Sequence, residues 1–360
     1  MTHPPANAPR RVPVAPSFTV VVAVRNEAAT LPAALEALAR QRYPPDRLEV
    51  LVVDGGSTDG SAAIASRYPF RVLADGGRGP GAARNLGVAA ARGSIVAFTD
   101  GDCRPDPGWV AALAERFADP DVVGVGGALR HPDRGTVFSR LEDLTLRATY
   151  RGFITSNVAY RASALAVVGG FDEALTCGED WDLYWRILDA GGRIVYAPEA
   201  VVWHDPPESA SPARYLRKQF WYARSDVRLF AKRARALAER RGKRGRSAVA
   251  PIRAAAANAT GYALLAAGAL GGLPAAAAAG AVLASSGLAP IVASPEAAAH
   301  RGRLLAAGVL KGAVRAVGTA AGLADLARRR PRVTLRRAPA WALAKPAPIL
   351  NPPSAIPREA

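Results

Sequence analysis

The sequence is poor in cysteine, with only Cys103 and Cys177 among its 360 residues. Two thiols without paired spacing provide neither a disulfide framework nor a zinc site, and they indicate a reducing compartment. Residues 1–16 are rich in proline and alanine and lack an apolar run. They therefore predict a disordered leader rather than a secretory signal. No internal repeat is found beyond alanine-rich low complexity.

Charged side chains are absent from residues 254–293, although the whole chain carries a formal net charge of +17. The segment 271–274 divides this stretch into two halves of roughly 18–20 residues, each about long enough to cross a bilayer as a helix. Both flanks are rich in arginine, so the positive-inside rule predicts that both are cytoplasmic. Because alanine is barely hydrophobic, a soluble helical hairpin is the alternative.

Much of the positive charge follows residue 214, and it predicts attraction to nucleic acid, anionic lipid or a phosphorylated substrate. The basic residues of 228–246 lack the repeated aromatic interleaving of single-strand nucleic-acid binders. We therefore expect anionic membrane lipids, and no nucleic acid, as partners of this part of the chain.

Strand and helix patterns alternate through the first hundred residues. The expected strands are residues 18–24, 48–53, 70–73 and 94–99, and the expected helices between them are 31–38, 61–68 and 82–91. This alternation predicts a mostly parallel α/β sheet, in which ligands bind beyond the carboxyl ends of the strands. Further strands are expected at 122–125 and 193–196, and a helix at 180–190.

Acidic residues follow two of these strands. Asp54 and Asp59 enclose a Gly-Gly-Ser-Thr turn, and Asp100 and Asp102 flank a single glycine. The carboxylates of Asp100 and Asp102, with a glycine between them, can turn toward one point and hold Mg²⁺ or Mn²⁺. Turn formation and helix capping use the same residue types, so a purely structural role is the alternative for both segments.

Three acids, Glu179, Asp180 and Asp182, begin the expected helix at 180–190. They complement the helix dipole, or one of them serves as a general base. Trp181 and Trp185 are candidates for apolar walls that would raise the pKa of a neighbouring carboxylate, or for core residues. His204 follows an apolar run and completes a metal site only if it meets Asp102 in space.

In this order, the segments resemble the inverting GT-A glycosyltransferases of family 2 from about residue 17 to residue 204. The motifs that carry the resemblance are Val24-Arg25-Asn26-Glu27, Gln41-Arg42-Tyr43-Pro44, Val53-Asp54-Gly55-Gly56-Ser57-Thr58-Asp59-Gly60, Gly81-Ala82-Ala83-Arg84-Asn85-Leu86-Gly87, Phe98-Thr99-Asp100-Gly101-Asp102, Gly169-Gly170-Phe171-Asp172-Glu173 and Gly178-Glu179-Asp180. Each motif alone is weakly specific, whereas the ordered set is highly specific.

The resemblance implies a role for each matching position. Glu27, Asp54 and Arg84 would line the nucleotide pocket, with Asp100 near the ribose. Asp102 would hold a divalent metal, Mg²⁺ or Mn²⁺, that bridges the donor diphosphate, and Asp180 would be the catalytic base. The acceptor side would include Phe171, Asp172, Glu179 and Trp181.

The expected activity is therefore transfer of a sugar, with inversion, from a nucleoside-diphosphate sugar to a hydroxyl of a glycan or lipid-linked acceptor. The expected place is the cell membrane, with the catalytic domain on the cytoplasmic face and a role in polysaccharide or lipid-linked glycan synthesis. Residues 217–224 only loosely resemble the Gln-x-x-Arg-Trp segment of processive synthases, and the order of residues argues against processive polymerisation.

Three alternative functions are weighed against this activity. The segment 77–82 fits the G-x-G-x-x-A pattern of an NAD-type oxidoreductase, but it does not follow the first strand and Pro80 stiffens its turn. A non-enzymatic binder of nucleic acid or lipid is supported only by charge. A degenerate transferase that acts as a scaffold is disfavoured because all the expected acids are present.

The predicted organisation has five parts. It comprises a disordered leader (1–16), a GT-A catalytic domain (17–225), a basic linker (226–250), a helical, membrane-associated region (251–327) and a disordered basic tail (328–360).

Overall fold

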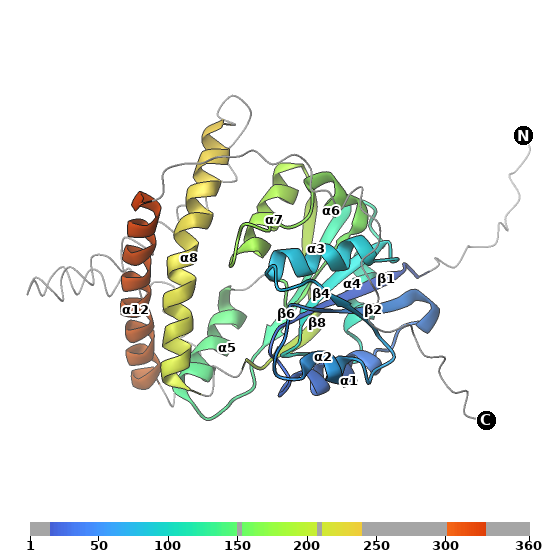
Figure 1. The fold of residues 1–360 in the computed structure, drawn as a ribbon, viewed down its shortest axis with the longest axis horizontal. Helices are drawn as coiled ribbons and strands as arrows, with labels where there is room; N and C mark the ends of the chain where they lie inside the picture. Colours follow the sequence, from blue (N-terminus) through green and yellow to red (C-terminus); the bar gives the residue numbers. More distant parts are fainter. Residues whose placement is uncertain (1–14, 150–152, 207–210, 240–300, 329–360) are drawn as a thin grey trace, which may run out of the picture.

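The computed structural model describes residues 15–149, 153–206, 211–239 and 301–328. Within these ranges, eight strands form one sheet in the order β3-β2-β1-β4-β7-β6-β8-β5. The strands are β1 (Phe18–Val24), β2 (Leu48–Asp54), β3 (Arg71–Ala74), β4 (Ile95–Asp100), β5 (Cys103–Pro105), β6 (Val122–Arg130), β7 (Val158–Arg161) and β8 (Arg193–His204). Helices cover both faces of this sheet, and a further helical layer lies beside it (Figure 1).

The first four strands in sequence form the parallel half of the sheet. β1 pairs in parallel with both β2 and β4, and β2 pairs in parallel with β3. Val20, Val21 and Val22 are fully buried, because a continuous β-branched run fits a strand that is covered on both faces. This half confirms the predicted alternation of strands and helices.

The second half of the sheet is mixed, which corrects the expectation of a mostly parallel sheet. β7 lies between β4 and β6 and is antiparallel to both, and β5 is antiparallel to β8. Only β6 and β8 pair in parallel there.

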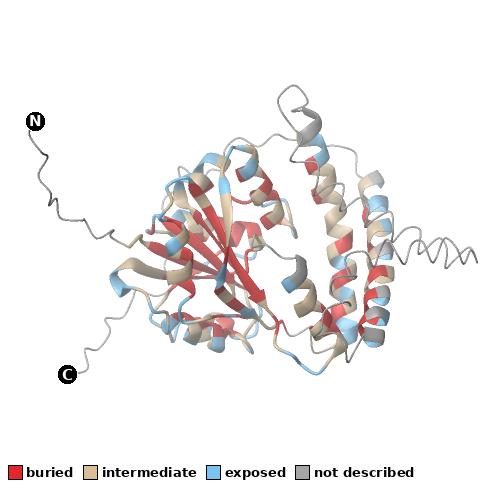
Figure 2. Cartoon of the chain, turned by 180° about the vertical axis from the view of Figure 1, so that it is seen from behind, coloured by how far each residue is buried: buried red, intermediate tan, exposed pale blue. Residues whose placement is uncertain are grey.

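Two hydrophobic cores lie on opposite faces of the sheet (Figure 2). The first packs β1 and β2 against α1 (Leu31–Ala39) and α4 (Trp109–Arg116), and also contacts α2 (Ser61–Ala65). The second packs the sheet against α3 (Pro80–Ala90), α6 (Ala162–Val168) and α7 (Glu179–Asp189). Leu183, Trp185 and Ile187 of α7 are buried, so the helix predicted at 180–190 is present with its apolar face inward.

The additional layer consists of α5 (Val137–Thr149), α8 (Pro212–Glu239) and α12 (Arg301–Arg328). α8 and α12 run side by side in the same direction, because Lys311 lies over Tyr215 and Asp325 bonds Arg224. Gly318 and Gly322 allow the close approach: a Cβ at these positions would lie 2.4 Å from the Phe220 carbonyl oxygen and 2.6 Å from that of Arg224. The helices therefore pack backbone against backbone.

The predicted boundary between residues 225 and 226 falls inside α8, so residues 226–239 are helix rather than linker. Leu229 and Arg233 in this part are buried, and Arg233 bonds Asp189 of α7. Packing against α7 therefore accompanies a helix that continues beyond residue 225.

Several predicted segments lie outside the described residues: 1–14 of the leader, 240–300 and 329–360. The uncharged stretch 254–293 is among them. Of the helices that the structure describes, none combines the length and the apolar character that crossing a bilayer requires.

Candidate active site

A cavity of about 1400 Å³ lies between the carboxyl end of the sheet and the helices α5, α8 and α12. Single small-molecule pockets are usually roughly 300–1,000 Å³, so this cavity has room for two substrates. The predicted site residues that line it are Glu27, Arg84, Asp100, Asp102, Glu179, Asp180, Trp181 and His204. Asp54, Phe171 and Asp172 lie outside its lining.

Asp54 organises a turn instead of lining the cavity. It ends β2 in a buried position, and its carboxylate accepts hydrogen bonds from the backbone N–H groups of Gly56 and Ser57. Asp59 similarly accepts from the backbone N–H of Ser61, at the start of α2. Asp54 is therefore absent from the lining that Asp102 and Asp180 share, although Gly55 beside it does line the cavity.

Phe171 and Asp172 also have structural positions. Phe171 is buried in the core against Phe98, at 5.1 Å between ring centroids. Its backbone N–H and carbonyl both bond the side chain of Asn85. Asp172 accepts a hydrogen bond from Lys232 of α8 at 2.6 Å. These contacts fix the loop before α7, and neither side chain lines the cavity.

Three carboxylates, of Glu27, Asp100 and Asp102, crowd the end of β1 and β4. Burial, together with the charges of Asp102 and Asp100, raises the pKa of Glu27 to about 9. Glu27 Oε2 is buried without a hydrogen-bond partner among the described residues, and a Cβ on Gly101 would lie 2.1 Å from it. The glycine therefore makes space for the Glu27 carboxylate. An unsatisfied oxygen among crowded acids fits a divalent cation, which prefers such oxygens and relieves their repulsion.

The side chains of Asp102 and His204 lie in contact, which is what the sequence analysis required for His204 to complete a metal site. Pairing of β5 with β8 aligns Cys103 with His204, and His204 Nε2 lies 3.3 Å from Asp102 Oδ2. One possible ligand atom from each of Asp102, Cys103 and His204 lies within 4.8 Å of the others. Burial opposes the ion pair, but the mutual attraction lowers the pKa of Asp102 and raises that of His204. The donor set of Asp102 and His204, with Glu27 nearby, suits Mg²⁺ or Mn²⁺.

Arg84 connects three elements within the acidic site. Its guanidinium donates to Asp100 Oδ1 at 2.8 Å and to Glu179 Oε1 at 2.6 Å, and it is buried. Burial opposes its charge, but Asp100 and Glu179 hold the pKa of Arg84 above its usual range. Arg84 thus lines the cavity, and its guanidinium forms ion pairs with two carboxylates of the protein itself.

Asp180 is buried in the first turn of α7. Burial and the adjacent charge of Glu179 raise the pKa of Asp180 to about 7. Its Oδ1 accepts a hydrogen bond from the backbone N–H of Trp181 at 2.8 Å. Trp181 and Trp185 stand 5.7 Å apart between ring centroids, and both line the cavity. A carboxylate with a pKa near neutrality is suited to accept a proton at physiological pH.

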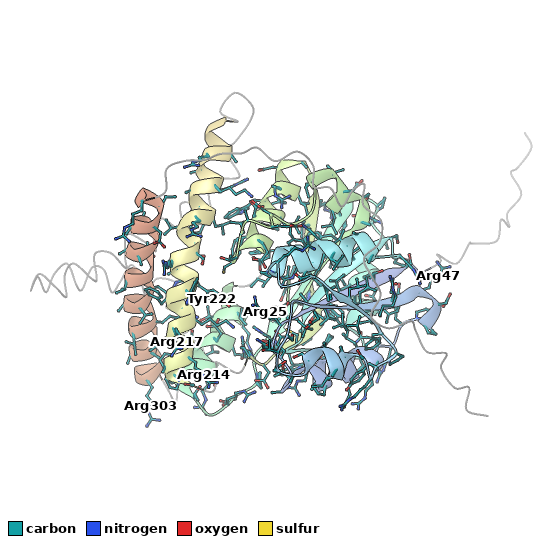
Figure 3. The ribbon with its side chains drawn as sticks, viewed as in Figure 1. Arg25, Arg47, Arg214, Arg217, Tyr222 and Arg303 are labelled. Atoms are coloured by element: carbon teal, nitrogen blue, oxygen red, sulfur yellow. The ribbon has the colours of Figure 1, made fainter. Side chains whose placement is uncertain are left out.

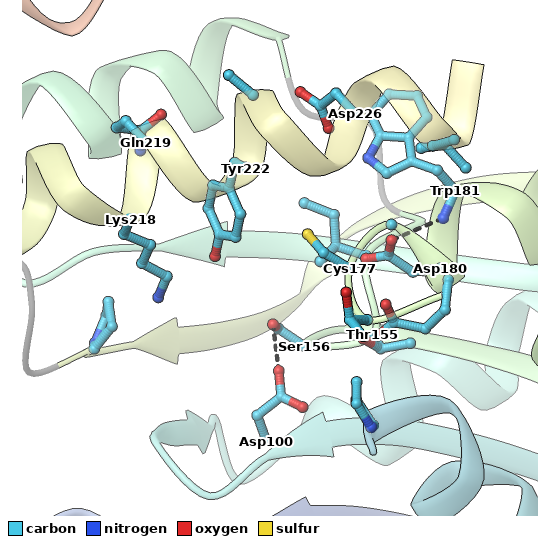
Figure 4. A pocket seen from close by; sticks show the side chains of 18 of the residues that line it. Asp100, Thr155, Ser156, Cys177, Asp180, Trp181, Lys218, Gln219, Tyr222 and Asp226 are labelled. Carbon is cyan, nitrogen blue, oxygen red and sulfur yellow. Dashed lines mark hydrogen bonds between the residues drawn. The ribbon is translucent and has the colours of Figure 1, made fainter. Parts of the chain in front are cut away.

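The sequence did not identify the contribution of the loop before β7. Ser156 donates to Asp100 Oδ2 at 2.7 Å, so both oxygens of Asp100 are held by protein groups (Figure 4). No motif marks Ser156. The only signal is its place just before a short strand.

α8 forms the wall of the cavity opposite the sheet. Lys218 and Tyr222 project from it toward the loop that carries Ser156 (Figure 4). Gln219 and Asp226 also line the cavity, and both accept hydrogen bonds from Arg315 of α12. Arg25 approaches from the end of β1, and Arg214, Arg217 and Arg303 mark the end where α8 and α12 begin (Figure 3). The helical spacing of 215, 219, 222 and 226 is a signal in the sequence that could have indicated this wall.

The fold and the acidic site define a GT-A-type glycosyltransferase. The solved structure of the mannosyltransferase PcManGT from Pyrobaculum calidifontis, in complex with GDP-Man and Mn²⁺, is similar with a TM-score of 0.56 and 26% identity. The similarity covers 84% of this chain and 87% of that chain.

The chain belongs to glycosyl transferase family 2. Residues 19–169 match the sequence model of Glycosyl transferase family 2, and residues 95–285 match that of Glycosyl transferase family group 2. The protein is therefore a glycosyltransferase, and the oxidoreductase and non-enzymatic alternatives are set aside.

Curated relatives agree with this assignment. Glycosyltransferase AglE of Haloferax volcanii is 31% identical over 60% of this chain and 74% of that protein. The pre-mycofactocin glycosyltransferase of Mycobacterium tuberculosis is 36% identical over 54% of this chain, and the match spans 44% of that protein. The succinoglycan biosynthesis protein ExoO of Rhizobium meliloti is 35% identical over 53% of this chain and 61% of that protein.

Proposed function

We propose that this glycosyltransferase moves a sugar from a nucleoside-diphosphate donor to an acceptor hydroxyl with inversion of configuration. The observation that carries the proposal is the arrangement of Asp180 and the Asp102–His204 pair around one cavity. A proton acceptor and a cluster of metal-ligating groups are the two chemical parts that such a transfer needs.

Asp180 acts as the general base. The acceptor oxygen attacks the anomeric carbon and gives its proton to the Asp180 carboxylate. At the same time the bond from that carbon to the diphosphate oxygen breaks, and the nucleoside diphosphate leaves with the electron pair. One displacement from the opposite face inverts the configuration, and holding both substrates in one cavity supplies much of the acceleration.

Asp102 and His204 are the residues that would hold Mg²⁺ or Mn²⁺, with Glu27 beside them. When bound, the metal neutralises charge on the departing diphosphate. Arg84 keeps Asp100 and Glu179 in place, and the short Asp100–Ser156 bond fixes the loop before β7. The metal in the PcManGT complex supports this part of the proposal.

Asp180→Asn tests the assignment of the base. The variant should keep its affinity for the donor nucleotide and lose transfer by about 10²-fold or more, because the amide accepts no proton. Asp226→Asn is the matched control: Asp226 lines the same cavity, but Arg315 bonds it at 2.6 Å. Nucleoside-diphosphate release is measured across UDP- and GDP-sugars with Mn²⁺. Full activity of Asp180→Asn would exclude Asp180 as the base.

The enzyme is also proposed to work at the cytoplasmic face of the cell membrane, on a glycan or lipid-linked acceptor. The uncharged stretch 254–293 and its arginine-rich flanks support this placement. Co-flotation with vesicles that contain anionic lipid measures the association. A chain that stays at the bottom of the gradient at low and high salt would contradict it.

A further inference from the structure

The part of the cavity beyond Asp226 is lined by apolar residues. α8 contributes Val227, Phe230, Ala231 and Ala234, and α12 contributes Leu323 and Leu326. These residues lie together, because Gly322 of α12 packs against Val227 and Phe230 lies 6.0 Å from Trp185 between ring centroids. We call this part the apolar end.

The charged residues of the same turns of α8 point elsewhere. Lys232 bonds Asp172 and Asp182, and Arg233 bonds Asp189. None of these side chains lines the cavity. Ala231 and Ala234 have small apolar side chains, so the six residues of the apolar end present no side chain that forms a hydrogen bond.

The apolar end adjoins the proposed base. Leu229 packs against Gly178, two residues before Asp180, and both residues line the cavity together with Trp181 and Trp185. An acceptor whose hydroxyl reaches Asp180 would therefore extend its remaining part toward Val227 and Leu323. The opposite end of the cavity holds the Asp102–His204 pair and belongs to the donor.

The chemistry of the walls decides between two kinds of acceptor. A sugar chain carries hydroxyls on every ring, and each hydroxyl buried without a partner costs roughly 1–3 kcal/mol. An alkyl or isoprenoid chain has no such groups and gains free energy from burial. Leu323 is 55% exposed although it lines the cavity, so apolar surface is available to such a chain.

We infer that the apolar end binds the hydrocarbon part of an apolar-tailed acceptor, whose hydroxyl is presented to Asp180. This inference rests on the proposed function for the role of Asp180, and it selects a lipid-like acceptor over a free glycan. The bound tail lies in the apolar end of the cavity, against Phe230 and Leu323.

The probes are methyl glucoside and n-octyl glucoside, which differ only in the length of the alkyl chain. Binding to the full-length protein, purified without alkyl-glycoside detergent, is measured calorimetrically below the micelle concentration. Octyl glucoside should bind at least about 10²-fold more tightly, because two buried methylenes already contribute roughly tenfold.

Leu323→Gln and Leu310→Gln form the matched pair. Both leucines are exposed on α12, at 55% and 46%, but only Leu323 lines the cavity. Leu323→Gln should weaken octyl glucoside binding about tenfold and leave methyl glucoside binding unchanged. Leu310→Gln should bind both probes as the unsubstituted protein does.

Equal binding of the two probes, or an octyl preference that survives Leu323→Gln, would overturn the inference. Equal binding of the two probes is the result expected if residues 254–293 of the chain itself, and not an acceptor, occupy the apolar end. Nucleotide release from UDP- and GDP-sugars is measured in parallel. Failure of that reaction with an intact octyl preference would refute the proposed function and leave the tail site standing.

Discussion

The pH dependence of transfer is the most direct consequence of the buried position of Asp180. Its pKa is raised to about 7 by burial first and by the charge of Glu179 second. A base must be ionised to accept a proton, so activity should be present above this pKa and fall as the pH drops through it.

The size of the effect follows from the titration. Below the pKa, the ionised fraction falls tenfold per pH unit, so kcat/KM should be about one tenth of its plateau at pH 6 and about one hundredth at pH 5. An exposed aspartate, with a pKa near 3.8, would give a flat profile across this range.

Glu179→Gln isolates the electrostatic part of the shift. Glutamine still bonds Arg84, but it removes the negative charge beside Asp180, so the acid limb should move to lower pH. The pH of this acid limb should stay above the value for an exposed aspartate, because Asp180 remains buried in the variant. Glu173→Gln, on the exposed loop before α7, is the control and should leave the limb unchanged.

The assay is nucleoside-diphosphate release at subsaturating donor from pH 5 to pH 9, with far-UV circular dichroism at each pH to verify folding. A flat profile between pH 5 and pH 7 would refute the assignment of Asp180 as a buried base. So would an acid limb that Glu179→Gln shifts upward.

Three further predictions concern the metal cluster and the packing. Asp102→Ala should weaken Mn²⁺-dependent nucleotide binding, measured by titration calorimetry with and without Mn²⁺; an unchanged affinity would argue against the metal site. Arg84→Met should lower the free energy of unfolding by about 3–5 kcal/mol in urea denaturation, since it leaves Asp100 and Glu179 buried without their cation; a loss below about 1 kcal/mol would contradict this. Gly87→Ala should lower the free energy of unfolding by about 1–3 kcal/mol in the same assay, because its Cβ would lie 2.4 Å from Val21 Cγ1. Unchanged stability would show that Val21 shifts to accommodate the added methyl group.

The parallel half of the sheet was predictable because its signals are local. The run from Phe18 to Val24 is long, β-branched and without polar alternation, and only a doubly covered strand suits it. β7 has four residues, and its two neighbours are determined by contacts far along the chain. A short segment without a period of its own contains no information about its partners.

The sequence identified residues that line the cavity where both the residue type and its position after a strand indicated a site. It also selected residues outside the lining, because the same residue types serve in turns and in the core. Asp54 and Asp102 both end or follow buried strands, but backbone N–H groups at the turn satisfy Asp54. Phe171 is a plausible aromatic wall by sequence, and its burial against Phe98 emerges only from the fold. The Asp102–His204 pair needed the register of β5 on β8, which local patterns do not contain.

The parallel packing of α8 and α12 has a practical consequence for designing shortened versions of the enzyme. A truncated chain that ends after residue 239 would lose Arg315, Leu323 and Leu326, and with them one side of the substrate chamber. Replacing residues 240–300 by a linker is feasible only if the linker returns along the full length of a 28-residue helix, about 42 Å. At roughly 3.3 Å per extended residue, a tether much shorter than about 13 residues would pull the two helices out of register.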